Sequence, residues 1–189
     1  QKGSVRTKYG TREEYLDAVR AAHDAGMQVY ADTVFNHKLG GDNEEEFKAT
    51  PYNPDNRHEA LGELQTMKAW TNFTFPGRKG KYSGLEWHWW HFNAVDHNAM
   101  AEDQKAVYLF EGKSFTDGVD LEKGNFDFLM GCNLDISNPD VQKELYYWGE
   151  WYLETTGVDG FRFDAAKHVK AGFFLDWLQH LREHSGREL

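Results

Sequence analysis

The sequence contains a single cysteine, Cys132, among its 189 residues. One thiol cannot form an internal disulfide, so the cysteine content gives no support for secretion. A lone cysteine in a globular domain is most often a small apolar residue of the core. We therefore expect Cys132 to be buried rather than to act as a reactive thiol.

The chain also lacks an apolar run of the ~18 to 20 residues that a membrane-spanning helix needs. Its basic residues form no stripe, and the net charge is −10, whereas nucleic-acid binders carry a basic face. We expect neither a membrane nor a nucleic acid as partner. No signal peptide is visible and the first residue is Gln1 rather than Met, so we expect the chain to begin inside a larger protein.

Aromatic residues, in contrast, are abundant: they make up 15% of the chain and include seven tryptophans. Exposed aromatic rings stack on the apolar faces of sugars and on nucleic-acid bases. Without a basic stripe, a sugar is the better expectation. Trp70, Trp87, Trp89 and Trp90 are candidate sugar contacts, although aromatic residues in strands more often belong to the core.

Capping signals and apolar spacing predict alternating helices and strands. Thr11 opens a capping box with Glu14, and Gly26 and Gly157 stand where helices end. The predicted helices are 12–25, 139–156 and 171–184, and the predicted strands are 27–35 and 158–163. This alternation favours the α/β class with parallel strands.

Residues 39–136 are too many for a loop inside a compact domain. They include strand-like segments at 68–75 and 87–92 between glycine-rich turns, and we interpret them as an irregular β-rich insertion. The predicted organisation is therefore 1–38, then the insertion 39–136, then 137–189.

Charged side chains gather at the ends of the two predicted strands. Side chains alternate along a strand, so Arg162 and Asp164 should share one face, opposite Phe161 and Phe163. The arginine would then stabilise the ionised form of Asp164, as a carboxylate nucleophile requires. An isolated Arg-x-Asp pair, however, is more often a structural ion pair. Gly160 is expected to let neighbouring backbone come close.

Three segments carry a resemblance to a known family: Asp32-Thr33-Val34-Phe35-Asn36-His37, Asn133-Leu134-Asp135 and Gly160-Phe161-Arg162-Phe163-Asp164-Ala165-Ala166-Lys167-His168. In this order they resemble motifs of the α-amylase family, glycoside hydrolase family 13. Residues 1–10 and 87–92 look like the bacterial liquefying and cytoplasmic members. The resemblance implies a partial (β/α)8 barrel, contributing its third and fourth strands, with an inserted domain B.

The resemblance also implies roles for individual residues. Asp164 matches the catalytic nucleophile and Arg162 the arginine that keeps it charged. The implied substrate contacts are His37 in the cleavage subsite, Lys167 and His168 on the leaving-group side, and Asp32, which is structural within the active site. The substrate implied is an α-glucan such as starch or glycogen.

A calcium site is implied as well, formed by Asn36, Asp127, Asn133 and the backbone carbonyl of His168. Oxygen donors from distant segments suit a hard cation. Asn133 departs from the aspartate of the secreted enzymes, and Asn93, Thr116 and Ser137 replace acids that those enzymes use for further metals. Cytoplasmic relatives share some of these changes, which inclines the expected location toward the cytoplasm. The histidines at 88, 91 and 97 could suggest zinc, but with tryptophans between them and no cysteine nearby, packing or a cleft role is favoured.

The implied reaction is endo-acting, retaining hydrolysis of α-1,4-glucosidic bonds. The general-acid glutamate and a second aspartate would lie on later barrel strands, so we expect an incomplete catalytic domain that is inactive alone. One alternative is an exo-acting maltooligosaccharide-forming amylase or a transglycosylase. Another, of a different class, is a catalytically silent glucan-binding module.

Overall fold

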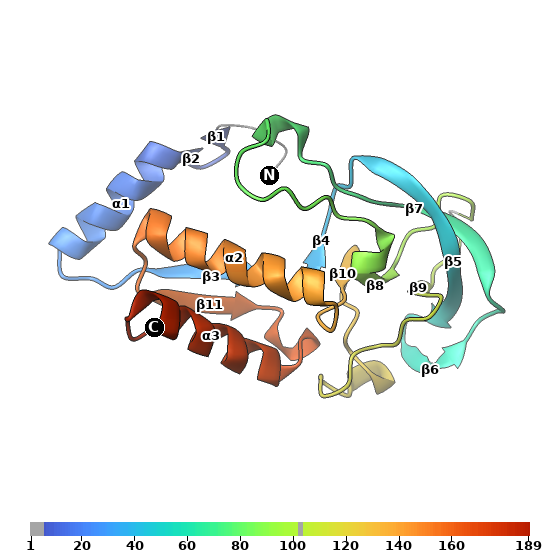
Figure 1. The fold of residues 1–189 in the computed structure, drawn as a ribbon. Helices are drawn as coiled ribbons and strands as arrows, with labels where there is room; N and C mark the ends of the chain where they lie inside the picture. The colour runs from blue at the N-terminus through green and yellow to red at the C-terminus, as the bar shows by residue number, and fades with distance from the viewer. Residues whose placement is uncertain (1–5, 102–103) are drawn as a thin grey trace.

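The computed structural model describes residues 6–101 and 104–189. Its elements form two bodies, which Figure 1 shows side by side. One body holds three helices and a pair of parallel strands, and the other is a seven-stranded antiparallel sheet. A short hairpin, β1 (Arg6–Thr7) and β2 (Gly10–Thr11), precedes the first helix.

The three predicted helices are confirmed to within one residue at each end: α1 (Arg12–Asp24), α2 (Pro139–Thr156) and α3 (Ala171–Ser185). The expected caps explain their limits. The Thr11 hydroxyl accepts a hydrogen bond from the Glu14 backbone N–H, and the Glu14 carboxylate accepts one from the Thr11 N–H. The Asn138 side chain caps α2, and Gly157 ends that helix at φ 70°.

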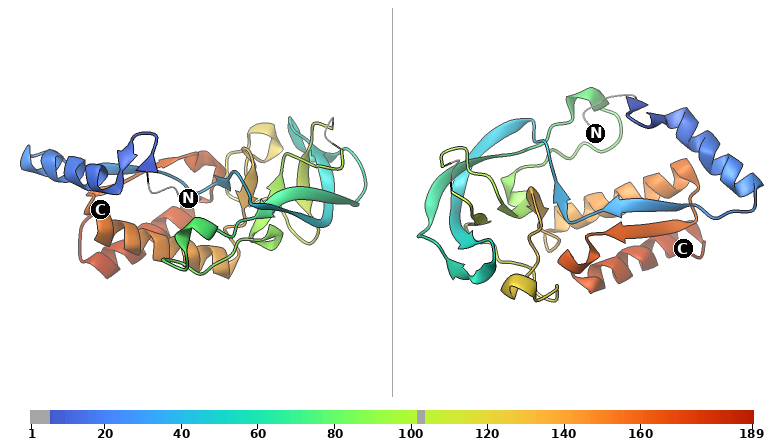
Figure 2. Two further views of the ribbon diagram at one scale, coloured as in Figure 1. Left: turned by 90° about the horizontal axis from the view of Figure 1, so that it is seen from above. Right: turned by 180° about the vertical axis from the view of Figure 1, so that it is seen from behind.

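Strands β3 (Tyr30–Val34) and β11 (Gly160–Asp164) pair in parallel, as predicted. Residues 27–29 do not extend β3, because the Val29 N–H donates to the Asp159 carboxylate (2.7 Å) instead of a neighbouring strand. Helices α2 and α3 cover one face of the pair (Figure 2). The Phe161 ring lies 4.9 Å from that of the buried Trp177 on this face, whereas Tyr30 on the other face is exposed.

The expectation for Gly160 is wrong in its detail. A Cβ at this position would lie 2.5 Å from Cε1 of the Tyr30 ring. The close neighbour across the strand pair is therefore an aromatic side chain and not backbone.

The seven-stranded sheet confirms the β-rich insertion. Its strands are β4 (His37–Lys38), β5 (Asn43–Asn53), β6 (Asn56–Ala60), β7 (Gln65–Asn72), β8 (Phe92–Val95), β9 (Val107–Phe110) and β10 (Cys132–Leu134). The order is β4-β10-β8-β9-β5-β6, with β7 paired to β5. Cys132 is buried in it, and burial raises the pKa of its thiol to about 12, which fits a core residue rather than a nucleophile.

The predicted strand at 87–92 is wrong over most of its length. Residues Trp89–His91 form a 3-10 turn, η2, because the His91 imidazole accepts the His88 N–H (2.9 Å) and the Glu45 carboxylate accepts the Trp89 N–H (2.8 Å). Trp87 is part of the core at 1% exposure, so the packing alternative holds for it. Trp70 and Trp90 are exposed.

The segment predicted as a strand at 68–75 is shifted toward the N-terminus. Strand β7 starts at Gln65 and ends at Asn72, after which Phe73 makes only an isolated bridge with Trp87. Three more 3-10 turns are η1 (Pro76–Arg78), η3 (Glu122–Gly124) and η4 (Ala166–His168). Within the described residues, no helix has the length and apolar character to cross a membrane.

Candidate active site

Arg162 forms the centre of the strand-end cluster. Its Nη1 lies 2.8 Å from Asp32 Oδ1 and 2.6 Å from Asp164 Oδ1. The register explains this, since Arg162 faces Asp32 across the parallel pair and alternation brings Asp164 to the same face. The hydrogen bonds from Arg162 to Asp32 and then to Asp164 raise the pKa of the guanidinium. All three side chains are about half exposed or more, so a ligand can reach them.

His37 follows β3, at the start of β4, close enough to Asp164 for the two charges to interact. It is half-buried, and its Nδ1 lies 3.2 Å from Asn36 Oδ1. Burial lowers the pKa of His37, and the nearby His168 adds to this, while the charges of Asp164 and Asp96 act in the opposite direction. The ring is therefore neutral at pH 7 and can exchange hydrogen bonds with hydroxyl groups.

Lys167 and His168 lie in η4, directly after β11. The Lys167 ammonium donates to the Glu122 carboxylate (2.7 Å) and lies 4.6 Å above the Phe126 ring. The His168 imidazole is buried, with Nδ1 2.5 Å from the Phe126 carbonyl oxygen. Both residues are thus held by the segment 122–126. The sequence does not indicate the role of Glu122, because no local pattern shows that its loop meets η4.

A second cluster, the oxygen-rich centre, joins the two bodies. The Asn36 Nδ2 donates to the Asp127 carbonyl (2.9 Å), to Asn133 Oδ1 (2.9 Å) and to the His168 carbonyl (3.2 Å). All four predicted metal-site residues are therefore brought together, and all are buried. Three oxygens from segments far apart in sequence converge on one point.

The Asp127 carboxylate supplies the one formal negative charge among these four residues. Burial raises its pKa, an effect that the hydrogen bonds from the Thr116 N–H (3.0 Å) and the Asn93 amide (2.7 Å) partly offset. Asn133 Nδ2 also donates to Asn93 Oδ1 (2.8 Å). Carboxylate, amide and carbonyl oxygens are the donors that a hard cation prefers, so the chemistry of this set fits Ca²⁺.

Carboxylates and an arginine at the carboxyl ends of two parallel strands, with a β-rich insertion between those strands, are typical of the barrel-type α/β class. The family model for the α-amylase catalytic domain matches residues 3–179. The chain belongs to the α-amylase family, and the expected partial barrel with an inserted β-rich domain is confirmed.

Individual relatives agree with this placement. The chain is 48% identical over 191 residues to an α-amylase of Geobacillus stearothermophilus, covering 100% of this chain and 35% of the relative. It is 44% identical over 191 residues to a glucan 1,4-α-maltohexaosidase of Bacillus sp. strain 707, covering 100% of this chain and 37% of that relative. The chain thus spans little more than a third of the length of these curated relatives.

Among solved structures, an α-amylase from Geobacillus thermoleovorans, in complex with acarbose, aligns with a TM-score of 0.51 and 21% identity. The alignment covers 97% of this chain and 29% of that chain. At this identity the likeness supports the fold.

Proposed function

We propose that the chain provides the nucleophile-bearing part of an endo-acting, retaining α-1,4-glucan hydrolase. The observation that carries the proposal is the Arg162 guanidinium, which hydrogen-bonds Asp164 and Asp32 at the ends of two parallel strands in a member of the α-amylase family. A starch-type glucan is the proposed substrate.

In this reaction a carboxylate oxygen of Asp164 attacks the anomeric carbon, and the bond from that carbon to the leaving oxygen breaks. A second carboxyl group protonates the leaving oxygen, and later removes a proton from the water that releases the sugar. We expect this second carboxyl from residues outside these 189. Arg162 fixes the orientation of Asp164, because one guanidinium nitrogen binds both strand-end carboxylates.

The neighbouring side chains position the sugar in this proposal. Neutral His37 would hydrogen-bond a hydroxyl of the sugar ring under attack. Lys167, which Glu122 holds in place, would contact the sugar on the leaving-group side. The predicted contact from His168 does not fit this arrangement, because its ring is buried against Phe126, so His168 would act only by positioning η4.

We propose the oxygen-rich centre as a calcium site. Asn36, Asp127, Asn133 and the His168 carbonyl would hold the ion. The Asn36 amide would have to turn, because its Nδ2 faces the other three oxygens here. Asn36 and His168 follow the parallel strands, while Asp127 and Asn133 belong to the segment that forms the antiparallel sheet. A bound cation would supply structural cross-linking of the two bodies rather than chemistry on the substrate.

Replacing Asp164 with Asn tests the nucleophile. In the full-length protein, Asp164→Asn should lower kcat on soluble starch by several orders of magnitude and leave the thermal midpoint nearly unchanged, because an amide cannot form the glycosyl ester. Asp24→Asn, at the end of α1, is the matched control and should keep its activity. An Asp164→Asn protein that hydrolyses starch at a rate comparable to that of the wild type would refute the assignment of Asp164 as nucleophile.

An exo-acting, maltooligosaccharide-forming enzyme is the second candidate. The 44% identity to a glucan 1,4-α-maltohexaosidase favours keeping it. Product sizes from soluble starch at early reaction times separate the two, since an endo-acting enzyme releases a broad range of lengths and an exo-acting one a single short product.

A further inference from the structure

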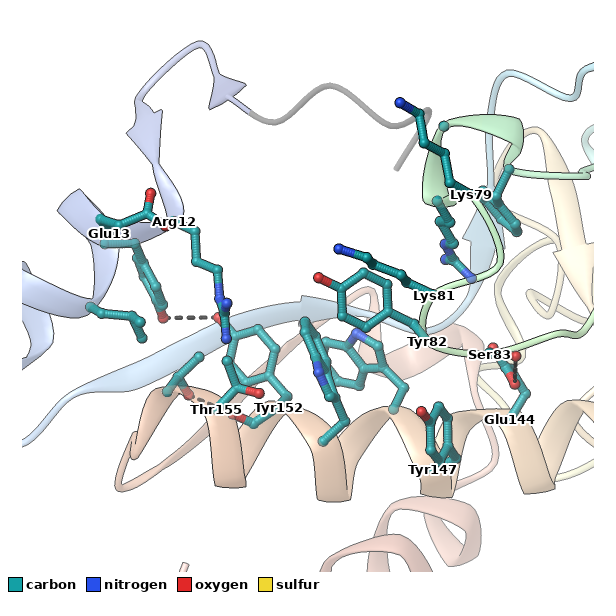
Figure 3. A pocket seen from close by; sticks show the side chains of 18 of the residues that line it. Arg12, Glu13, Lys79, Lys81, Tyr82, Ser83, Glu144, Tyr147, Tyr152 and Thr155 are labelled. Carbon is teal, nitrogen blue, oxygen red and sulfur yellow. Dashed lines mark hydrogen bonds between the residues drawn. The ribbon is translucent and has the colours of Figure 1, made fainter.

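A cavity of about 940 Å³ lies between α1, the loop that contains η1, and α2. Figure 3 shows side chains from these elements around it. The residues that line it do not include Asp32, Arg162 or Asp164. Nothing in the proposed hydrolysis uses this cavity.

Four cations line the cavity: Arg12, Arg78, Lys79 and Lys81. Two acids, Glu13 and Glu144, line it as well, and the charge of Arg78 acts on Glu144. Among the residues that the structure describes, none of the four forms an ion pair, although other basic side chains such as Lys113 and Lys167 do so. The chain carries a net charge of −10, so acids are plentiful elsewhere. Unpaired cations that gather at one cavity produce a local positive potential that favours an anion.

Lys38 adds a fifth cation at the inner wall. Its ammonium lies 4.3 Å from the centre of the Trp87 ring, and no described carboxylate pairs with it. Burial, together with the charge of Arg78, lowers the pKa of Lys38 to about 8, and the charge of Glu144 offsets this only in part. The inner wall would therefore gain from an anion in the cavity.

Aromatic rings and hydroxyl-binding groups form the rest of the wall. Tyr82 is 55% exposed, and its ring lies 5.5 Å from that of Trp151 at 70°. Rings nearly perpendicular to each other cannot sandwich a planar base, but each can pack against the C–H face of a sugar. The Ser83 hydroxyl donates to one oxygen of Glu144 (2.6 Å), whose other oxygen makes no hydrogen bond with a described residue and can accept from a sugar hydroxyl.

We propose that this cavity binds a sugar phosphate, with the phosphate between Arg12 and Lys81 and the sugar ring against Tyr82 and Trp151. In Figure 3, Arg12 and Lys81 extend from opposite sides into the space between α1 and the loop. Charge-assisted hydrogen bonds from these two side chains hold the phosphate. The Glu144 carboxylate accepts hydrogen bonds from the sugar hydroxyls at the end of the cavity away from the phosphate. The site stands independently of the proposed hydrolysis.

Calorimetric titration of the full-length protein with glucose 6-phosphate tests the proposal. We expect one bound molecule per chain and about a 10-fold or greater loss of affinity in Arg12→Gln and in Lys81→Gln. Tyr82→Ala should weaken glucose 6-phosphate binding and leave the binding of inorganic phosphate unchanged. Lys143→Gln, an exposed cation of α2 that does not line the cavity, is the matched control and should bind normally.

Three results would overturn the proposal: no binding, binding that both cation variants retain, or inorganic phosphate bound as tightly as glucose 6-phosphate. If adenosine monophosphate bound more tightly than glucose 6-phosphate, the site would be a nucleotide site and the sugar-phosphate proposal would be wrong. Asp164→Asn should keep the affinity for glucose 6-phosphate, so failure of this site and failure of the hydrolase assignment can be told apart.

Discussion

At the scale of single residues, Asp159 connects the start of β11 to α1 and to the segment before β3. Its carboxylate accepts hydrogen bonds from the Val29 N–H (2.7 Å) and the His23 ring (2.8 Å), and Arg187 lies 3.5 Å away. The Val29 N–H, followed by the His23 contacts, lowers the pKa of Asp159 below its usual 3.8. The ionised form is therefore favoured by folding.

Asp159→Asn should destabilise the protein by roughly 1 to 2 kcal/mol at pH 7, because hydrogen bonds to a charged acceptor are lost. A group with a lowered pKa in the folded state contributes stability above pH 3.8, and this contribution disappears as the pH falls through the lowered pKa. Thermal unfolding measured from pH 7 down to pH 3 should show a constant difference in midpoint between wild type and variant at pH values well above 3.8. This difference should shrink as the pH falls below that value. A gap that widens below pH 4 would contradict this.

Asn133 tests the calcium proposal at the same scale. Asn133→Asp adds a second carboxylate beside Asp127, so it should raise the calcium affinity about 10-fold. In the presence of a chelator the same substitution should lower the thermal midpoint, because the two buried carboxylates then repel each other. Asn98→Asp, another buried asparagine outside the centre, is the control and should not change the calcium-induced shift. A midpoint that neither calcium nor chelator moves in wild type would refute the site.

At the scale of elements, the contact between α2 and α3 depends on one glycine. A Cβ at Gly149 of α2 would lie 2.5 Å from Cζ2 of Trp177 and 3.1 Å from Cδ1 of Leu181, both fully buried on α3. Gly172, in the first turn of α3, has no such neighbour, since its nearest contact is Lys170 Cε at 4.0 Å.

These two glycines give a matched pair of substitutions. Helix propensity alone favours alanine over glycine by about 1 kcal/mol at either site. Gly172→Ala should therefore be neutral or stabilising, whereas Gly149→Ala should destabilise by about 1 to 3 kcal/mol, because the new methyl group overpacks the interface. Urea unfolding followed by tryptophan fluorescence measures both. Equal effects at the two sites would show that Trp177 does not limit the packing.

The helices and parallel strands were predictable because their signals are local. Thr11 and Glu14 show the start of α1 in four residues, and alternation placed Arg162 and Asp164 on one face. The turn at Trp89–His91 was not predictable, because it depends on Glu45, more than forty residues away. The cavity beside α1 likewise depends on a loop in which Phe75, Lys79 and Tyr82 adopt left-handed backbone conformations, which no pattern in their sequence indicates.

At the scale of the whole molecule, the motifs predicted which residues meet but not how each side chain is held. Asn36, Asp127, Asn133 and His168 converge between the two bodies, as the resemblance implied. The burial of the His168 ring against Phe126 and the pairing of Lys167 with Glu122 arise from the fold of the insertion. Only the backbone path of residues 120–126 beside η4 produces these contacts.

The proposed active site lies on the open face of the β3–β11 pair. Arg162, Asp32 and Asp164 are about half exposed or more. By alternation they lie on the face of the strand pair opposite to Phe161 and Phe163, whose rings pack against Trp177 of α3. The proposed substrate would therefore meet the proposed nucleophile on this face. The oxygen-rich centre adjoins the cluster through Asn36, which lies next to His37, whereas the residues that line the proposed sugar-phosphate cavity do not include the strand-end cluster.

The central claim is that Asp164 forms a covalent bond to the sugar. The direct measurement treats the full-length protein with a fluorinated glycosyl fluoride that glycosylates the enzyme and turns over slowly, followed by mass spectrometry of its peptides. We predict one added glycosyl group, located on Asp164, and none in the Asp164→Asn variant. A glycosyl group on another carboxylate, such as Asp32, would contradict the assignment.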